Sequence, residues 1–264
     1  MKRFLSPFET AIETSKKCVF KSNMKFIEIL LLGMLGGFFI SLGAHGSIVI
    51  SQTLGNIDEG LMKFASASIF PVGLMLIVIA GGELFTSNNM ISFSFIEKKI
   101  KFRNVMKNWI IVYFSNYIGA LLFAFAIVYS GMYTNSGVNN SAGELLVGIA
   151  TKKVNLNLYE LVIRGILCNI VVVMSVWMAT AAQDVVSKIS ACWFPIMLFV
   201  LSGFEHSVAN MFYLHAAQLI NADITFTQVF SNLIPVTIGN IIGGGVIVPF
   251  IFYFAIYRPY CKNN

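Results

Sequence analysis

The chain has 264 residues, of which 57% are apolar and only 11% are charged, and its formal net charge is +6. Its mean hydropathy of +0.78 is far above that of soluble domains. These values exclude an ordinary soluble enzyme or binding domain and indicate a protein of the lipid bilayer. A basic chain can also bind nucleic acid, but no soluble domain is present to carry that function, so we expect no nucleic-acid partner.

The first 27 residues are polar and rich in lysine, unlike the rest of the chain. Their apolar residues follow helical spacing beside three lysines: Phe4, Leu5, Phe8, Ile12 and Val19, with Lys16, Lys17 and Lys21. The apolar run that follows is too long for the core of a cleavable signal peptide. We therefore expect residues 1–27 to remain as a cytoplasmic amphipathic helix at the membrane surface.

Six apolar runs of about 20 residues follow, which is the length that crosses the hydrocarbon core of a bilayer. They begin near Glu28, Phe64, Asn108, Tyr159, Ile189 and Gln228. Glutamates interrupt the second and the fifth run. The sequence thus predicts an all-α membrane protein with a single domain over residues 28–257, containing six transmembrane helices of which helices 2 and 5 are broken.

Positive residues gather before the first run, between the second and third, and after the sixth. They are Lys2, Arg3, Lys16, Lys17, Lys21 and Lys25, then Lys98, Lys99, Lys101, Arg103 and Lys107, then Arg258 and Lys262. Because short loops rich in Lys and Arg stay in the cytoplasm, we expect both termini, including the tail 258–264, to be cytoplasmic. This topology suits the cell inner (cytoplasmic) membrane. The four cysteines have no metal-site spacing, and we expect neither a metal nor a cofactor.

Two stretches inside the apolar runs share one pattern. "GGELFTSN" at 81–88 places Gly, Glu and Asn at the spacing that "GFEHSVAN" repeats 122 residues later, so that Glu83 and Asn88 match Glu205 and Asn210. Asn108, Asn116 and Gly119 match Asn232, Asn240 and Gly243 after 124 residues. Two similar halves of three spans, about 28–130 and 159–257, must enter the membrane from opposite sides. The pattern predicts an inverted repeat whose broken helices line a path between the halves.

The two glutamates have two interpretations. They could be functional groups of the path, or they could cap the broken helices by accepting the backbone N–H groups that a break sets free. We favour capping for Glu83 and Glu205, with Asn88 and Asn210 as further support of the breaks.

The residues beside the glutamates differ between the halves. Leu84 and Thr86 follow Glu83, whereas His206 follows Glu205, and Phe199 precedes His206 by two helical turns, so a continuous helix would stack the two rings. A lone histidine is often a packing residue, but an ionisable group inside a span is a functional candidate. We interpret His206 as a group of the path, leave His45 open and treat His215 as structural.

These stretches resemble the formate/nitrite transporter family over most of the chain. Further segments that carry the resemblance are "NWIIVYFSNYIG" at 108–119, "RGILCNIVVVMSVW" at 164–177, "SGFEHSVANMF" at 202–212 and "VTIGNIIGGG" at 236–245. The resemblance implies an aquaporin-like protomer that assembles as a homopentamer with one pore in each protomer.

The resemblance also implies roles for single residues. Phe70 and Phe199 would form the outer apolar constriction and Leu74 the inner one, and Lys153 would lie at the outer mouth, although Lys152 beside it could face the pore instead. The chamber between the constrictions would be lined by Leu84, Thr86, Asn169 and His206.

An anion can pass such apolar walls only at a high desolvation cost. Because desolvation also raises the pKa of an acid, a weak-acid anion can take up a proton, from water or by way of His206, and cross as the neutral acid. We therefore expect small monovalent anions and protons as partners: formate, nitrite or hydrosulfide. A proton-coupled carrier for a larger monocarboxylate such as acetate or lactate is the alternative. The chain lacks a zinc H-E-x-x-H helix and any Asn-Pro dipeptide, which argues against an intramembrane enzyme and against an aquaporin.

Overall fold

The computed structural model describes residues 4–259. Cys261, and three of the charges used above for the orientation, Lys2, Arg3 and Lys262, lie outside the described residues. The helices are α1 (Pro7–Ser22), α2 (Phe26–Ser51), η1 (Leu54–Asn56), α3 (Glu59–Ile69), α4 (Val72–Met75), η2 (Leu76–Gly81), α5 (Phe85–Asn88), η3 (Asn89–Ile91), α6 (Ser92–Ile96), α7 (Phe102–Tyr129), α8 (Ser141–Val154), α9 (Leu158–Ala181), α10 (Val185–Leu201), α11 (Ser207–Leu219), α12 (Phe226–Asn240), η4 (Ile241–Ile247), α13 (Val248–Phe252) and η5 (Tyr253–Tyr257). A short antiparallel hairpin, β1 (Thr134–Asn135) and β2 (Val138–Asn139), precedes α8.

Five helical segments of the described chain are long and apolar enough to cross a membrane. They are Phe26–Asn56, Glu59–Gly81, Phe102–Tyr129, Leu158–Ala181 and Phe226–Tyr257. The remaining apolar run corresponds to α10, a shorter helix of 17 residues, about 26 Å long at the usual rise per residue. The second and third spans start several residues before the apolar runs do, because charged residues such as Lys107 continue the helix past the apolar segment.

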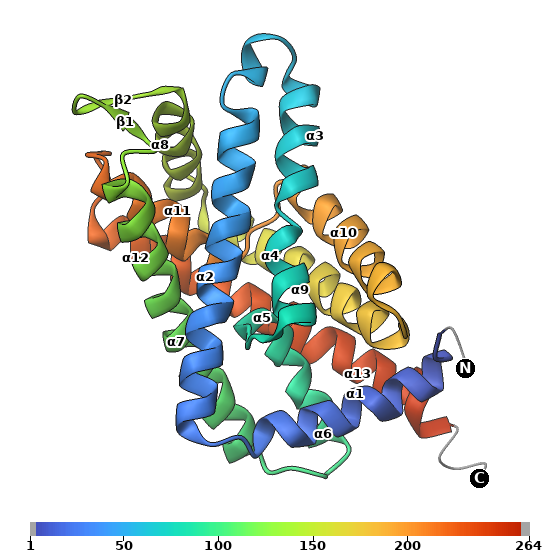
Figure 1. Ribbon diagram of the computed structural model, residues 1–264. Helices are drawn as coiled ribbons and strands as arrows, with labels where there is room; N and C mark the ends of the chain where they lie inside the picture. Colours follow the sequence, from blue (N-terminus) through green and yellow to red (C-terminus); the bar gives the residue numbers. More distant parts are fainter. Residues whose placement is uncertain (1–3, 260–264) are drawn as a thin grey trace.

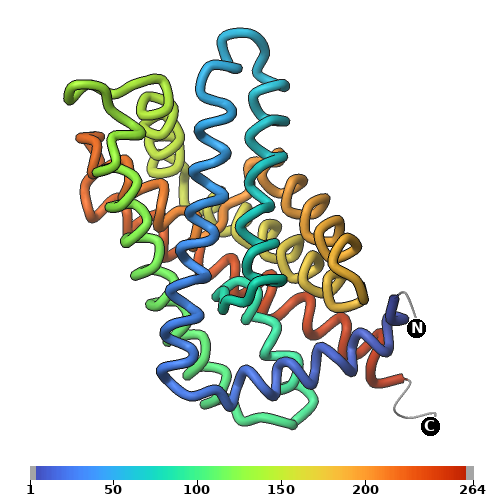
Figure 2. The backbone as a smooth tube through the Cα atoms, in the orientation of Figure 1, coloured from blue at the N-terminus to red at the C-terminus, as the bar shows by residue number. Residues whose placement is uncertain are grey.

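The spans form a bundle that α1 crosses at one end (Figure 1). The loop before α7 and both ends of the described chain lie at this same end, which we call the α1 end (Figures 1 and 2). The β1–β2 hairpin and the turn between α2 and α3 lie at the opposite end, the hairpin end. The described chain therefore begins and finishes on one side of the bundle.

The N-terminal segment that was expected to be helical is α1. It starts at Pro7 because Ser6 and Glu9 form a reciprocal capping box, with N···O distances of 2.9 and 3.3 Å. Its buried face carries small and polar residues, namely Thr10, Ala11, Thr14, Ser15, Cys18 and Ser22, while Phe20 is 70% exposed. The helix thus packs a side of small and hydroxyl-bearing residues against the bundle and turns Phe20 outward beside Lys16 and Lys17. Its place at a membrane surface stays a prediction.

Glycines bring the long helices close together at matching places in the two halves. A Cβ added to Gly119 on α7 would lie 1.9 Å from the Met34 carbonyl oxygen of α2, and one added to Gly243 on η4 would lie 2.2 Å from the Ile166 carbonyl oxygen of α9. Both contacts are with backbone, which cannot move aside cheaply. Small residues at such crossings let membrane helices approach closely.

Replacing Gly243 by Ala should therefore destabilise the protein, since overpacking costs about 1–3 kcal/mol. The measurement is the melting temperature of the detergent-purified protein. Gly148→Ala is the matched control, because nothing lies within 4 Å of a Cβ at this helical position. If G243A melts together with wild type and G148A, the close approach of η4 and α9 is not what this glycine provides.

Candidate functional site

The second span is interrupted after Gly81, and the interruption places one charged and one apolar side chain inside the bundle. Gly81 has a φ of 103°, which suits glycine, and Gly82 is extended before α5 begins at Phe85. The extended segment carries Glu83 and Leu84, both buried.

The second interruption lies between α10 and α11. α10 ends at Leu201, Gly203 has a φ of 68°, and α11 begins at Ser207. Glu205 and His206 occupy this turn and are buried, with 4% and 3% of their surface exposed. Each interruption therefore presents a glutamate followed by one residue of the expected path.

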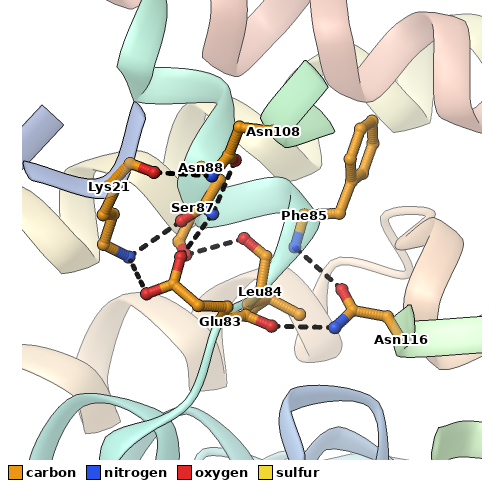
Figure 3. A network of polar contacts seen from close by, with 8 residues as sticks. All are labelled: Lys21, Glu83, Leu84, Phe85, Ser87, Asn88, Asn108 and Asn116. Carbon is orange, nitrogen blue, oxygen red and sulfur yellow. Dashed lines mark hydrogen bonds and ion pairs between the residues drawn. The ribbon is translucent and has the colours of Figure 1, made fainter. Parts of the chain in front are cut away.

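Two asparagines satisfy the backbone groups that the interruptions set free. Asn116 of α7 accepts a hydrogen bond from the Phe85 N–H at 2.8 Å and donates to the Glu83 carbonyl (Figure 3). It also donates to the Gly33 carbonyl of α2. Asn240 of α12 accepts from the Ser207 N–H at 3.0 Å and donates to the carbonyls of Gly165 and Glu205. An amide can both donate and accept, so one side chain ties a long helix to the turn beside it.

The prediction that the carboxylates cap the broken helices is therefore wrong. Glu83 accepts from Asn88 Nδ2 at 2.6 Å and pairs with Lys21 Nζ at 3.0 Å (Figure 3). Asn88 in turn donates to Asn108 of α7 at 2.9 Å. A carboxylate can only accept, and its negative charge is better compensated in a buried site by an ammonium group than by an N–H dipole.

The second half repeats this set of contacts. Glu205 accepts from Asn210 Nδ2 at 2.6 Å and pairs with Lys153 Nζ at 2.9 Å, and Asn210 donates to Asn232 of α12 at 2.8 Å. Asn232 then donates to the Lys153 carbonyl at 2.9 Å, as Asn108 does to the Lys21 carbonyl at 3.2 Å. Lys153 thus contacts the buried glutamate, whereas Lys152 is exposed.

One hydrogen bond joins the two interruptions. Thr86 Oγ1 lies 2.8 Å from His206 Nε2, and the backbone N–H of Ala209 donates to His206 Nδ1 at 3.1 Å. Because a backbone N–H always donates, Nδ1 carries no proton, and the neutral imidazole donates from Nε2 to the threonine oxygen. The hydroxyl hydrogen of Thr86 is then available for another acceptor.

Apolar side chains border this pair. Phe70 and Phe199 meet edge to face with ring centroids 5.4 Å apart, and Phe199 stacks on His206 at 5.9 Å and 25°. The helix does not continue between Phe199 and His206 as the spacing argument assumed, and the turn at Gly203 brings the rings together instead. Leu74 and Leu84 are also fully buried.

Asn169 of α9 lies in the same region and links the two halves. Its Nδ2 donates to Asn89 Oδ1 at 2.8 Å and to the Asn240 carbonyl at 2.7 Å, while its buried Oδ1 has no hydrogen-bond partner among the described residues. The interior thus keeps an unused acceptor close to the polar contacts of the second interruption.

Two cavities flank the buried residues, and they share no lining residue. The Lys153 cavity, of about 280 Å³, is bordered by Lys63, Lys152, Lys153, Phe70, Phe199 and His206. The Lys21 cavity, of about 270 Å³, is bordered by Lys17, Lys21, Lys188, Glu83, Ser87 and Thr180. Lysines thus gather at both ends of the interior. His45 and His215 border neither cavity and instead contact the hydroxyls of Tyr133 and Tyr117.

Sequence reasoning missed the part played by several residues. Asn108, Asn116, Asn232 and Asn240 were visible as a repeat but not as partners of the interruptions. Lys21 was interpreted only as a charge that sets the orientation. It is equivalent to Lys153 in its contact with a buried glutamate, but the two lysines are 132 residues apart, whereas the two glutamates are 122 residues apart, so the sequence comparison did not align them. Within residues 4–259, no three His, Cys, Asp or Glu side chains gather as a metal site.

Known proteins resemble this chain in sequence and in fold. A sequence profile described as formate/nitrite transporter matches residues 8–254. The chain is 38% identical to the formate channel BtFdhC of Bacillus thuringiensis over 98% of both proteins. It is 34% identical to the formate channel FocA of Escherichia coli (strain K12), over 96% of this chain and 94% of that protein.

Two solved structures share the fold. An ion channel described as belonging to the FNT family superimposes with a TM-score of 0.83 at 25% identity, covering 93% of this chain and 98% of the other. A pentameric formate channel with formate bound superimposes with a TM-score of 0.76 at 30% identity, covering 91% of this chain and 98% of the other.

Asn240→Ala should lower the folded yield and the melting temperature, because it leaves the Ser207 N–H and two carbonyls without their partner. A buried group left unsatisfied costs about 1–3 kcal/mol. Asn155→Ala is the matched control, since this exposed asparagine only contacts the Thr151 carbonyl of its own helix. Equal melting temperatures for the two variants would contradict the role given to Asn240.

Proposed function

The chain belongs to the formate/nitrite transporter family of multi-pass membrane proteins, and we propose that it is a channel for small monovalent weak-acid anions, with formate, nitrite and hydrosulfide as candidate substrates. The observation that carries this proposal is the order in which charged, apolar and polar side chains follow one another along the bundle. Two lysine-lined cavities are separated by buried apolar side chains, and the Thr86–His206 pair supplies polar groups between them. Such an arrangement attracts anions at both ends and rejects bare charge in the middle.

The proposed path runs from the Lys153 cavity past Phe70 and Phe199 into a chamber, and then past Leu74 to the Lys21 cavity. Leu84, Thr86, Asn169 and His206 line the chamber. The matching contacts of Glu83 and Glu205 support an inverted repeat of three plus three helices in which helices 2 and 5 are broken. In this proposal the glutamates and asparagines hold the breaks, and the residues next to them meet the substrate.

The anion crosses the apolar part as the neutral acid. Leaving water raises the pKa of a carboxylic or nitrous acid, so the anion takes up a proton as it approaches Phe70 and Phe199. His206 is a poor source of this proton, since a proton on Nδ1 would break the bond from the Ala209 N–H and face the positive end of α11. The proton therefore comes from water, while Thr86 and His206 hydrogen-bond the passing acid.

The assembly we propose is a homopentamer in the cell inner membrane with both termini cytoplasmic. The pentameric formate channel of the same fold supports the assembly. Lys99 and Lys101 precede α7 and Arg103 lies in its first turn, at the α1 end together with both ends of the described chain, which supports a cytoplasmic α1 end.

The experiment for the function is flux into proteoliposomes that contain the purified protein, with formate, nitrite, hydrosulfide and lactate compared at one pH. We expect rapid entry of the first three anions and much slower entry of lactate. A flux that is fastest for lactate, saturates and shows counterflow would instead identify a carrier for larger monocarboxylates.

Thr86→Val should slow formate flux about tenfold, the factor that one lost hydrogen bond of about 1.4 kcal/mol produces. The flux is normalised to the amount of folded protein, because the variant also leaves the His206 Nε2–H without its acceptor. Because water is the proton source, the flux should rise with falling pH in the same way as in wild type. Thr151→Val, at an exposed position of α8, is the control. A shifted pH profile in T86V would mean that the Thr86–His206 pair itself supplies the proton.

The orientation can be tested with cysteines because the three described ones are buried. Burial raises the pKa of the Cys18 thiol to about 12, so this residue reports neither side of the membrane. In a background of Cys261→Ser, an impermeant maleimide added to intact cells should label Asn135→Cys at the hairpin end and miss Lys101→Cys at the α1 end. Labelling of K101C alone would reverse the proposed topology.

A further inference from the structure

The Lys21 cavity contains a lysine whose charge is already compensated. Lys21 Nζ lies 3.0 Å from Glu83 Oε1 and donates to Asn88 Oδ1 at 2.8 Å, as Figure 3 shows. Two acceptors fix the ammonium group and a carboxylate neutralises it. Lys21 therefore belongs to the support of the first interruption and contributes little net field to the cavity.

Two further lysines border this cavity and have no such compensation. Lys17 of α1 donates to the hydroxyl oxygen of Thr180 at 3.2 Å, which is a neutral acceptor. Among residues 4–259, no carboxylate forms an ion pair with either Lys17 or Lys188 of α10, and Glu13, the acid next along α1, pairs with Lys16 at 3.5 Å. Lys17 is exposed, as Lys152 is, so its ammonium group faces solvent as well as the cavity. Partial desolvation and the nearby charge of Lys188 lower the pKa of Lys17, while Glu13 acts in the opposite direction, so the two ammonium groups repel each other across one cavity.

The Lys153 cavity is different. Lys153 pairs with Glu205 at 2.9 Å, and Lys63 pairs with Glu59 at 2.7 Å. Only Lys152 remains there without a carboxylate among the described residues, and it is exposed. The excess of unpaired positive charge is therefore greater at the α1 end, although three lysines border each cavity.

We propose that Lys17 and Lys188 form an anion-binding site at the α1 end of the path, which captures small monovalent anions that enter from this side. A bound carboxylate or nitrite would accept from both ammonium groups and relieve their repulsion. The cavity of about 270 Å³ has room for such an anion together with water. The choice of a small weak-acid anion as the ligand rests on the proposed function, whereas the presence of a positively charged site rests only on the positions of the two lysines.

The first test measures the positive site without relying on transport. Phe20→Cys, in a background of Cys261→Ser, places a thiol on a residue that borders the Lys21 cavity and is 70% exposed. The ratio of its reaction rates with an anionic and a cationic methanethiosulfonate reagent is measured at low salt, where charges are least screened. Combining Lys17→Gln with Lys188→Gln should lower this ratio roughly tenfold. Lys16→Gln is the control, because Lys16 is exposed and does not border the cavity.

An unchanged ratio in the double variant, or an equal fall in K16Q, would overturn the site. The second measurement is formate uptake into vesicles of each orientation. The double variant should need several times more formate for half-maximal entry from the α1 end and the same concentration from the hairpin end. Equal half-maximal concentrations from the α1 end in wild type and variant would also overturn it. The reaction-rate ratio could depend on Lys17 and Lys188 in a protein that transports no weak-acid anion. That result would contradict the proposed function and leave the anion-binding site standing.

Discussion

A helix that is interrupted inside a bilayer leaves backbone N–H and C=O groups where no water can reach them, and the interior of this protein is built around satisfying those groups. Asn116 and Asn240 do so from neighbouring helices, each accepting from the first N–H of the new helix and donating to two carbonyls. Glycines at the helix crossings let α7 and η4 come close enough to α2 and α9 for these contacts. The interruptions therefore depend on groups that lie far from them in the sequence.

The two buried glutamates at the interruptions also need partners, in their case for a negative charge. Glu83 and Glu205 are buried, and each is balanced by a lysine that the chain brings from a different helix, α1 in one half and α8 in the other. With most of the backbone groups and the charges satisfied in this way, the side chains next to the glutamates can differ between the halves, although His206 also accepts the Ala209 N–H at the start of α11. The first half uses that freedom for Leu84 and Thr86, and the second for His206, so the interior is symmetric in its support and asymmetric in its lining.

The parts of this arrangement that depend on local pattern could be predicted from the sequence. Glu83 with Asn88 and Glu205 with Asn210 stood out because carboxylates are rare in apolar runs, and both lie at interruptions of the helices. The capping role was wrong because the choice between a glutamate and a distant asparagine depends on three-dimensional contacts that spacing does not show. The roles of Lys21 and α8 were missed for a different reason. The helix α8 has no long apolar run, so it did not stand out in the sequence. The number of residues between the lysine and the glutamate with which it pairs also differs between the two halves.

The central claim is that a weak-acid anion crosses the apolar part of the path without its charge. The most direct measurement is the electrical response of proteoliposomes during formate entry, with the flux of formate and of protons recorded together. The account predicts one proton for each formate and no current when the membrane voltage is changed. A formate current that reverses at the equilibrium potential of the anion would contradict it, because the bare anion would then be the species that crosses.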